Sequence, residues 1–118
     1  MTFSIAKELN KSEPRFNYEI PENHTFAKPA ELVEANGLDQ VYKVMGMYVN
    51  TKGKFGDEPV IILDSCLLNA PNHSLEAVQS IITNDSYTDL VNKGRVGIKF
   101  YTYSNKFGKQ YGLQWVDL

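Results

Sequence analysis

The pattern of apolar and polar positions predicts four long β-strands, which are rich in β-branched and aromatic residues, contain a continuous apolar run, or alternate between apolar and polar positions. These four stretches are residues 41–50, 58–65, 95–104 and 110–118. Gly46 interrupts the first stretch and predicts a bulge or bend there. The second contains the continuous apolar run "VIIL", which favours burial on both faces or a tightly curved sheet. A third short strand or an irregular link is expected at "CLLNAP" (66–71).

Helical spacing appears in three other segments, residues 28–37, 72–83 and 85–94. In the first segment, Pro29 suits an opening turn and Gly37 suits a C-terminal stop. The preceding residues 1–24 are polar, and "RFNYEI" (15–20) is their one candidate strand.

The second and third helical segments lie between the second and third long strands. Leu75, Val78 and Ile82 share one face of the second helix, for which either Asn72 or Ser74 is a candidate cap. The third helix begins with Ser86-x-x-Asp89, a pattern resembling a capping box, and Gly94 is expected to end it.

Strand periodicity separates two faces of residues 95–104. Val96, Ile98, Phe100 and Thr102 share the face that we expect in the core, and the opposite face carries Arg95, Lys99, Tyr101 and Tyr103. In the last strand Tyr111, Leu113 and Trp115 form the bulky face. We therefore expect Trp115 to be buried.

This order of elements predicts a mainly β fold. An OB-fold, a five-stranded Greek-key barrel, with a helical insertion before its last hairpin accommodates all of the predicted strands and helices. We expect one domain, in which residues 39–118 form the barrel and residues 1–38 form an N-terminal arm and short helix that pack on the barrel or complete it. Residues 1–38 could alternatively form a flexible arm or a dimer contact. The sequence leaves open whether the protein forms a homo-oligomer.

Composition narrows the function classes only slightly. The 118 residues are 42% hydrophobic and 22% charged, with a formal net charge of -2. No apolar run is long enough to predict a membrane span, and we read no secretory signal at the N-terminus. A single cysteine, Cys66, favours a reducing, intracellular location. Charge is segregated, however, because residues 93–109 contain five cations and no acid.

The three letters "KFG" occur twice, at residues 54–56 and 106–108, each between two predicted strands. In an OB-fold, the loops between strands one and two and between strands four and five flank the nucleic-acid face, and these are the two loops that carry "KFG". Lysine attracts phosphate, an exposed phenyl ring stacks on an unpaired base, and glycine permits a positive φ. The competing interpretation is that Phe55 and Phe107 fold back onto the barrel and cap it.

We therefore predict a nucleic-acid interface made of the two loops and the exposed tyrosines. The candidate residues are Tyr48, Lys52, Lys54, Phe55, Lys99, Tyr101, Tyr103, Lys106, Phe107 and Lys109. DNA and RNA are not distinguished by stacking on a ring.

The segments "VYKVMGMYVNTKGKFGDEPVIILD", "LLNAPNHSLEAV" and "KGRVGIKFYTYSNKFGKQYGLQWVDL" make the chain similar to a known family. It resembles the small single-stranded-DNA-binding proteins of phages of lactococci and related Gram-positive bacteria. The resemblance implies an OB-fold, sequence-tolerant binding of single-stranded DNA, and work in phage DNA replication or recombination in the cytoplasm of the infected host. It also implies a recombinase or another replication protein as a candidate partner. The ending "QWVDL" reads as strand, unlike the acidic tail through which better-known bacterial single-strand binders recruit partners.

Two other function classes were weighed. An enzyme is disfavoured, because Cys66 and His73 show no nucleophile or zinc pattern, and Asp57, Glu58 and Asp64 read as a solvated turn more readily than as a Mg²⁺ site. We expect no cofactor. The second alternative is a protein-interaction module that binds a host or phage replication protein through the open barrel surface.

Overall fold

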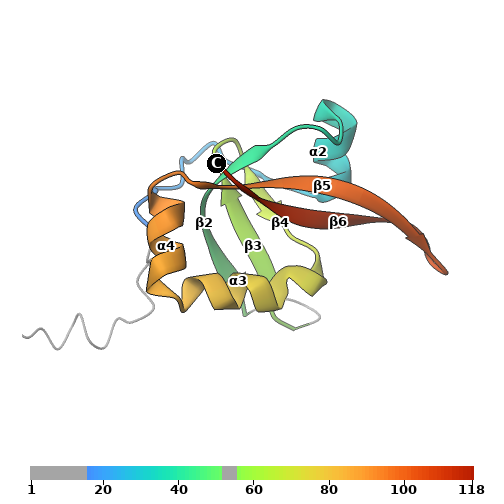
Figure 1. Ribbon diagram of the computed structural model, residues 1–118. Helices are drawn as coiled ribbons and strands as arrows, with labels where there is room; N and C mark the ends of the chain where they lie inside the picture. The colour runs from blue at the N-terminus through green and yellow to red at the C-terminus, as the bar shows by residue number, and fades with distance from the viewer. Residues whose placement is uncertain (1–15, 52–55) are drawn as a thin grey trace, which may run out of the picture.

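The long apolar runs form one curled sheet in the computed structural model, which describes residues 16–51 and 56–118 (Figure 1). Six strands lie in the order β1-β4-β3-β2-β5-β6, and the sheet curls into a half-barrel. The elements, in chain order, are β1 (Phe26–Ala27), α2 (Pro29–Asn36), β2 (Tyr42–Asn50), β3 (Glu58–Leu63), β4 (Leu67–Asn69), the 3₁₀ turn η1 (Asn72–Ser74), α3 (Leu75–Ile82), α4 (Asp85–Asn92), β5 (Val96–Asn105) and β6 (Gly108–Asp117). The mainly β prediction is confirmed, although the sheet has six strands where five were expected.

The strands β2, β3 and β4 form an antiparallel meander that is covered on both faces. One face of β3 presents Ile61 and Leu63 to the main core, while Val60 and Ile62 belong to a second buried cluster on the opposite face. The expectation drawn from the run "VIIL" is therefore confirmed. The register of β2 against β3 shifts between Val44 and Gly46, which places the predicted bulge.

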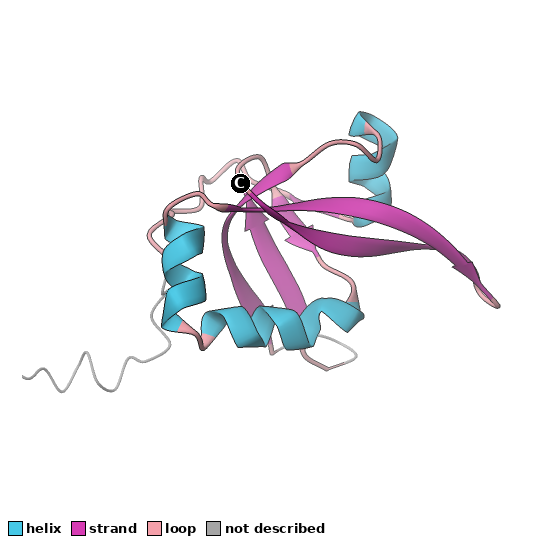
Figure 2. Cartoon of the chain, in the orientation of Figure 1, coloured by secondary structure: helices cyan, strands magenta, loops and turns pink. Residues whose placement is uncertain are grey.

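Helices α3 and α4 cover the main core face, each with one fully buried valine. Val78 of α3 and Val91 of α4 join the cluster that contains Ile61 and Leu63. Figure 2 shows the two helices along one side of the sheet, with the β5–β6 hairpin extending away from them. The helical insertion thus covers the core and the base of the hairpin, and the outer part of the hairpin extends beyond the helices.

The helices begin and end close to the residues that the sequence predicts, but the side-chain caps predicted for the starts of α3 and α4 are wrong. Helix α2 starts at Pro29 and stops at Gly37, whose φ is +83°. Neither predicted cap of α3 makes a side-chain hydrogen bond, because a 3₁₀ turn feeds directly into this helix. The predicted Ser86–Asp89 box of α4 is replaced by Asn84, whose Oδ1 accepts from the amides of Ser86 and Tyr87 at 3.0 and 3.2 Å.

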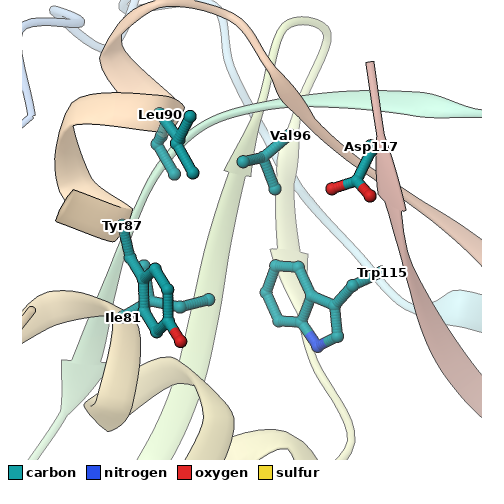
Figure 3. Close-up of a pocket in the computed structure, with 7 residues that line it drawn as sticks. Ile81, Tyr87, Leu90, Val96, Trp115 and Asp117 are labelled. Carbon is teal, nitrogen blue, oxygen red and sulfur yellow. The ribbon is translucent and has the colours of Figure 1, made fainter.

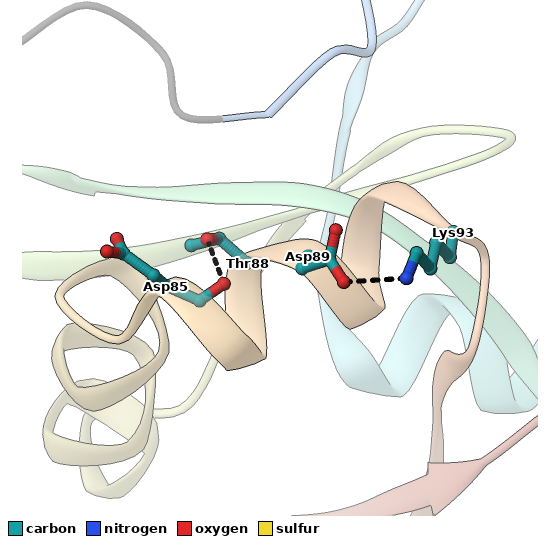
Figure 4. Close-up of polar contacts among 4 residues, drawn as sticks. All are labelled: Asp85, Thr88, Asp89 and Lys93. Carbon is teal, nitrogen blue, oxygen red and sulfur yellow. Dashed lines mark hydrogen bonds and ion pairs between the residues drawn. The ribbon is translucent and has the colours of Figure 1, made fainter.

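Asp89 makes a different contact from the one expected of a capping-box residue. Its carboxylate pairs with Lys93 at 2.8 Å, one turn further along α4. The hydroxyl of Thr88 donates to the carbonyl of Asp85 at 3.0 Å (Figure 4). Gly94, with φ +72°, then turns the chain into β5, as predicted.

The N-terminal part of the described chain packs across the sheet and joins its edge. Residues 16–20 form no strand, so the strand expected at "RFNYEI" is wrong for this described portion. The strand of this region lies further along, where Phe26 and Ala27 pair in parallel with Leu67 and Leu68 of β4. Phe16 packs against Gly46, where an added Cβ would come within 3.1 Å of the Phe16 side chain. The glycine therefore serves the bulge and also makes room for this ring.

The strands β5 and β6 pair along their whole length, whereas β5 pairs with β2 only at Tyr42↔Ile98 and Lys43↔Gly97. From Lys99 onward β5 therefore has β6 as its one neighbour in the described sheet. Residues 99–114 form a two-stranded ribbon whose base packs on the core through Phe100 and Leu113 and whose outer part projects from the half-barrel (Figure 1). We call it the β5–β6 arm. No helix in the described part of the chain is both long and apolar enough to cross a bilayer.

Candidate nucleic-acid interface

The β5–β6 arm ends in a tight turn at Lys106 and Phe107. Seven cross-strand pairs, from Lys99↔Gln114 to Asn105↔Gly108, separate the sheet from this turn, which corresponds to about 24 Å of ribbon at roughly 3.4 Å per residue. The side chain of Asn105 accepts from the Phe107 amide at 2.8 Å, the local contact that favours asparagine in turns. Gly108 has φ +98° and Gly56 has φ +108°, so both "KFG" glycines adopt the predicted positive φ.

One face of the arm carries an aromatic pair open to solvent. Tyr101 and Tyr103 are 46% and 39% exposed, and their ring centroids lie 6.1 Å apart at an angle of 39°. Half-buried Lys99 shares this face, as the alternation predicts, because Ile98 and Phe100 point into the core. We call Lys99, Tyr101 and Tyr103 the aromatic face.

Gly112 seats the ring of Tyr101. The two residues are directly opposed across the strands, and a Cβ placed on Gly112 would lie 2.1 Å from Cζ of Tyr101. The ring therefore covers bare backbone that any other residue type would block. The sequence showed Gly112 as a small residue on this face, but only the cross-strand register shows which ring it accommodates.

The tip of the arm presents a phenyl ring next to an ammonium group. Phe107 is 77% exposed, and Nζ of Lys106 lies 5.1 Å from its ring centroid. Nζ of Lys109 lies 5.6 Å from the ring centroid of Tyr111. Phe107 does not fold back onto the barrel, so the capping interpretation is wrong for this ring.

The charge of the arm has a single sign. Residues 99–114 contain Lys99, Lys106 and Lys109 and no acidic residue. A local field of this kind attracts an anion even though the whole chain carries a formal net charge of -2. The arm thus combines exposed rings with cations, which is the combination predicted for it.

Tyr48 lies apart from this arrangement. It pairs with Val60 and packs half-buried against the second cluster, where burial raises the pKa of its phenol. It follows Tyr42 by six residues along β2, whereas Tyr101 and Tyr103 follow Ile98 along β5 in the opposite direction. The structure therefore does not bring Tyr48 to the aromatic face.

The other "KFG" tip is described only at its margins. Lys52, Lys54 and Phe55 lie outside the described residues, and exposed Thr51 and Gly56 flank them. Their loop follows the end of β2, while the arm leaves the sheet beyond the start of β2, where β2 pairs with β5. Strand β2 thus runs from the β2–β5 junction in the direction opposite to the arm. The contribution predicted for Lys52, Lys54 and Phe55 rests on residues outside the described chain.

The sequence predicted that Trp115 would be buried, but its side chain is only half-buried in the structure. It packs at the margin of the main core, opposite Ile98 at the base of the hairpin, and it lines a pocket between β6 and the helices. Figure 3 shows Tyr87 and Leu90 of α4 across this pocket from Trp115, with Asp117 at its edge. The residues that line the pocket are Ile81, Tyr87, Leu90, Val91, Val96, Trp115 and Asp117. We call it the α4–hairpin pocket.

The sequence offered Cys66 as a candidate nucleophile and several acidic residues as candidate metal ligands. Cys66 is buried, and this burial raises the pKa of its thiol, the opposite of what activates a cysteine nucleophile. Within residues 16–51 and 56–118, no three His, Cys, Asp or Glu side chains are grouped so that they could hold a metal ion. His24 lies 3.2 Å from the carbonyl of Leu63 and 3.4 Å from the Tyr18 hydroxyl, so its contacts belong to the packing of the N-terminal segment.

Comparison of the chain with protein-family models, with curated proteins and with solved structures found no match.

Proposed function

We propose that this protein binds single-stranded DNA with little sequence preference and that the β5–β6 arm is the main contact surface. The observation that carries this proposal is the solvent-exposed row of rings Tyr101, Tyr103 and Phe107 on a ribbon whose charged side chains are all cationic. Large exposed rings cost free energy in water and therefore call for a ligand that covers them.

The chemistry of single strands suits these groups. Each unpaired base offers a flat π-face, and stacking on a protein ring contributes roughly 1–3 kcal/mol per base, whatever the base. The lysines neutralise phosphates and release their counterions. In a duplex the bases are already stacked and paired, so the rings gain nothing from them. This difference supports a preference for single strands and a weak dependence on sequence.

The chain path supports an OB-type barrel as the fold behind this function. The meander β2-β3-β4, the helical insertion, and a last hairpin whose first strand pairs with β2 follow the strand order of that fold. In our proposal β1 is an addition to the five barrel strands. We further propose, from the family resemblance, that the protein serves phage DNA replication or recombination in the host cytoplasm, with a recombinase or another replication protein as a partner.

Fluorescence anisotropy tests this proposal directly. Labelled oligo-dT, a duplex of equal length and oligo-U are titrated with the protein at two salt concentrations. We expect tight binding to oligo-dT, weak binding to the duplex, and an affinity that falls as salt rises. Equal affinity for single strands and duplex would refute the proposal. A flat salt response with retained binding would instead favour a surface that recognises protein.

A further inference from the structure

The α4–hairpin pocket has the size and lining of a receptor for an aromatic side chain. Its volume is about 210 Å³, and six of the seven residues that line it are apolar or aromatic. An apolar cavity of about 150 Å³ is known to hold benzene, so a phenyl ring fits. Tyr87 and Leu90 are 47% and 44% exposed, which leaves the pocket accessible from solvent.

The charge around the pocket selects the kind of aromatic segment that fits. Asp117 contributes an exposed carboxylate to the lining and makes no ion pair within the described chain. Helices α3 and α4 carry the acids Glu76, Asp85 and Asp89, of which Asp89 is paired with Lys93. The Nε of Arg95 donates to the carbonyl of Leu118, next to Asp117. A ring flanked by cations would therefore match both the apolar interior and the carboxylate of Asp117.

The arm tip of this same protein has that chemistry. Phe107 has the largest exposed fraction among the large hydrophobic side chains of the described chain, 77%. Lys106 precedes it, and Lys109 follows two residues later. The phenyl ring of the tip thus suits the apolar interior of the pocket, and the lysines of the tip suit the carboxylate of Asp117.

A tip cannot reach the pocket of its own chain. Trp115 and Asp117 pair with Ile98 and Val96 at the base of the hairpin, and the tip lies beyond Asn105↔Gly108. Seven to nine residue pairs of continuous ribbon separate the two sites, a span of about 24–30 Å. A Phe107 ring that occupies the pocket must therefore come from another molecule.

We infer that Phe107 at the arm tip of one copy docks into the α4–hairpin pocket of a second copy, with its flanking lysines facing Asp117. When two arms lie antiparallel, each tip meets the base of the other hairpin, so the same contact is made twice and closes a two-fold dimer. This inference does not depend on DNA binding. It gives Phe107 two uses that exclude each other, because a ring in the pocket cannot stack on a base.

Sedimentation velocity without DNA, from low micromolar to submillimolar protein, tests the contact through two complementary variants. Phe107→Ala removes the tip anchor, and Leu90→Lys places a cation at the exposed rim of the pocket, where it repels the lysines of the tip. We expect the unmodified protein to dimerise with rising concentration and each variant to raise the dissociation constant about tenfold or more. Leu38→Lys, at a side chain that is 40% exposed and lies outside the pocket lining, is the matched control and keeps the dimer.

Mixing the two variants provides the decisive result. Phe107→Ala keeps an intact pocket and Leu90→Lys keeps an intact tip, so an equimolar mixture regains one of the two contacts. The mixture should therefore associate more tightly than either variant alone and more weakly than the unmodified protein. Trp115 is the single tryptophan of the chain and lines the pocket, so its emission shifts when the mixture forms. A monomeric unmodified protein, or a mixture that associates no more tightly than either variant alone, would overturn the inference.

DNA binding distinguishes the failure of this inference from the failure of the proposed function. Leu90→Lys leaves the arm intact, so it should bind oligo-dT at least as well as the unmodified protein. Loss of dimerisation in this variant with retained DNA binding supports both ideas. Dimerisation that survives in both variants removes the inference and leaves the proposed function standing.

Discussion

Replacing Phe107 with alanine separates a ligand-binding ring from a structural one. With 77% of the side chain exposed, about a quarter of its surface is covered by the protein. A fully buried aromatic removes about 150–250 Å² from water, so the covered part is roughly 50 Å² and contributes about 1 kcal/mol to folding at 25 cal/mol per Å². The contact with Lys106 adds about 0.5–1 kcal/mol at an exposed site. The Phe107→Ala protein should therefore remain folded.

The effect on DNA binding should be larger than the effect on stability. Losing one stacked base costs roughly 1–3 kcal/mol, which corresponds to a rise of about 5- to 150-fold in the dissociation constant. Anisotropy with labelled oligo-dT measures the affinity, and circular dichroism together with chemical unfolding measures the stability. These titrations use protein concentrations at which the chain is monomeric, so that self-association does not enter the affinity.

Phe26→Ala is the matched control for this experiment. Phe26 is also a solvent-facing phenylalanine, 54% exposed, but it lies on β1 at the opposite edge of the sheet. We expect its replacement to leave the affinity for oligo-dT unchanged. If Phe107→Ala binds oligo-dT as tightly as the unmodified protein, the ring takes no part in binding; if it unfolds the domain, the ring is structural. Either result would refute the reasoning about the tip.

Two further predictions concern the arm. Gly112→Ala puts a methyl group where the Tyr101 ring lies, 2.1 Å from Cζ, so the ring must leave its seat and the affinity for oligo-dT should fall, up to the roughly 1–3 kcal/mol of one stacked base. The same substitution in a Tyr101→Ala background should cost nothing more, and an additional loss there would show that Gly112 acts through the backbone instead. Lys106→Gln and Lys109→Gln should each reduce the slope of log affinity against log salt by about 0.7. Lys93→Gln, whose lysine pairs with Asp89 on α4, should leave that slope unchanged, and an equal change in all three variants would contradict a specific role for the arm.

Part of the fold could be read from local patterns because the responsible forces act over a few residues. Strand alternation placed Ile98 and Phe100 inside and Tyr101 and Tyr103 outside, since successive side chains point to opposite faces. The continuous apolar run at residues 60–63 predicted that β3 would be buried on both of its faces. The cap of α4 was missed because Asn84 and Ser86 are both good capping residues, and the choice between them depends on where the chain enters the helix from α3.

Long-range pairing explains the other differences. The strand β1 has two residues and pairs in parallel with β4, so its own sequence carries no period that could reveal it. Tyr48 has the same character in the sequence as Tyr101, yet it is half-buried because the second cluster surrounds it. Trp115 is on the bulky face, as expected, but it stands at the base of the hairpin where the core ends, so it lines a pocket.

The sequence by itself determined where the four long strands run, which face of β5 meets water, and that two segments between predicted strands carry lysine, phenylalanine and glycine. These features follow from the spacing of side chains along a single strand. Only the tertiary structure decided that β5 leaves β2 after two residue pairs, and this departure turns a barrel hairpin into a projecting arm. It also brought α4 against the base of that arm to form the pocket. Both outcomes depend on contacts between residues that are far apart in the chain. The local spacing of side chains cannot predict such contacts.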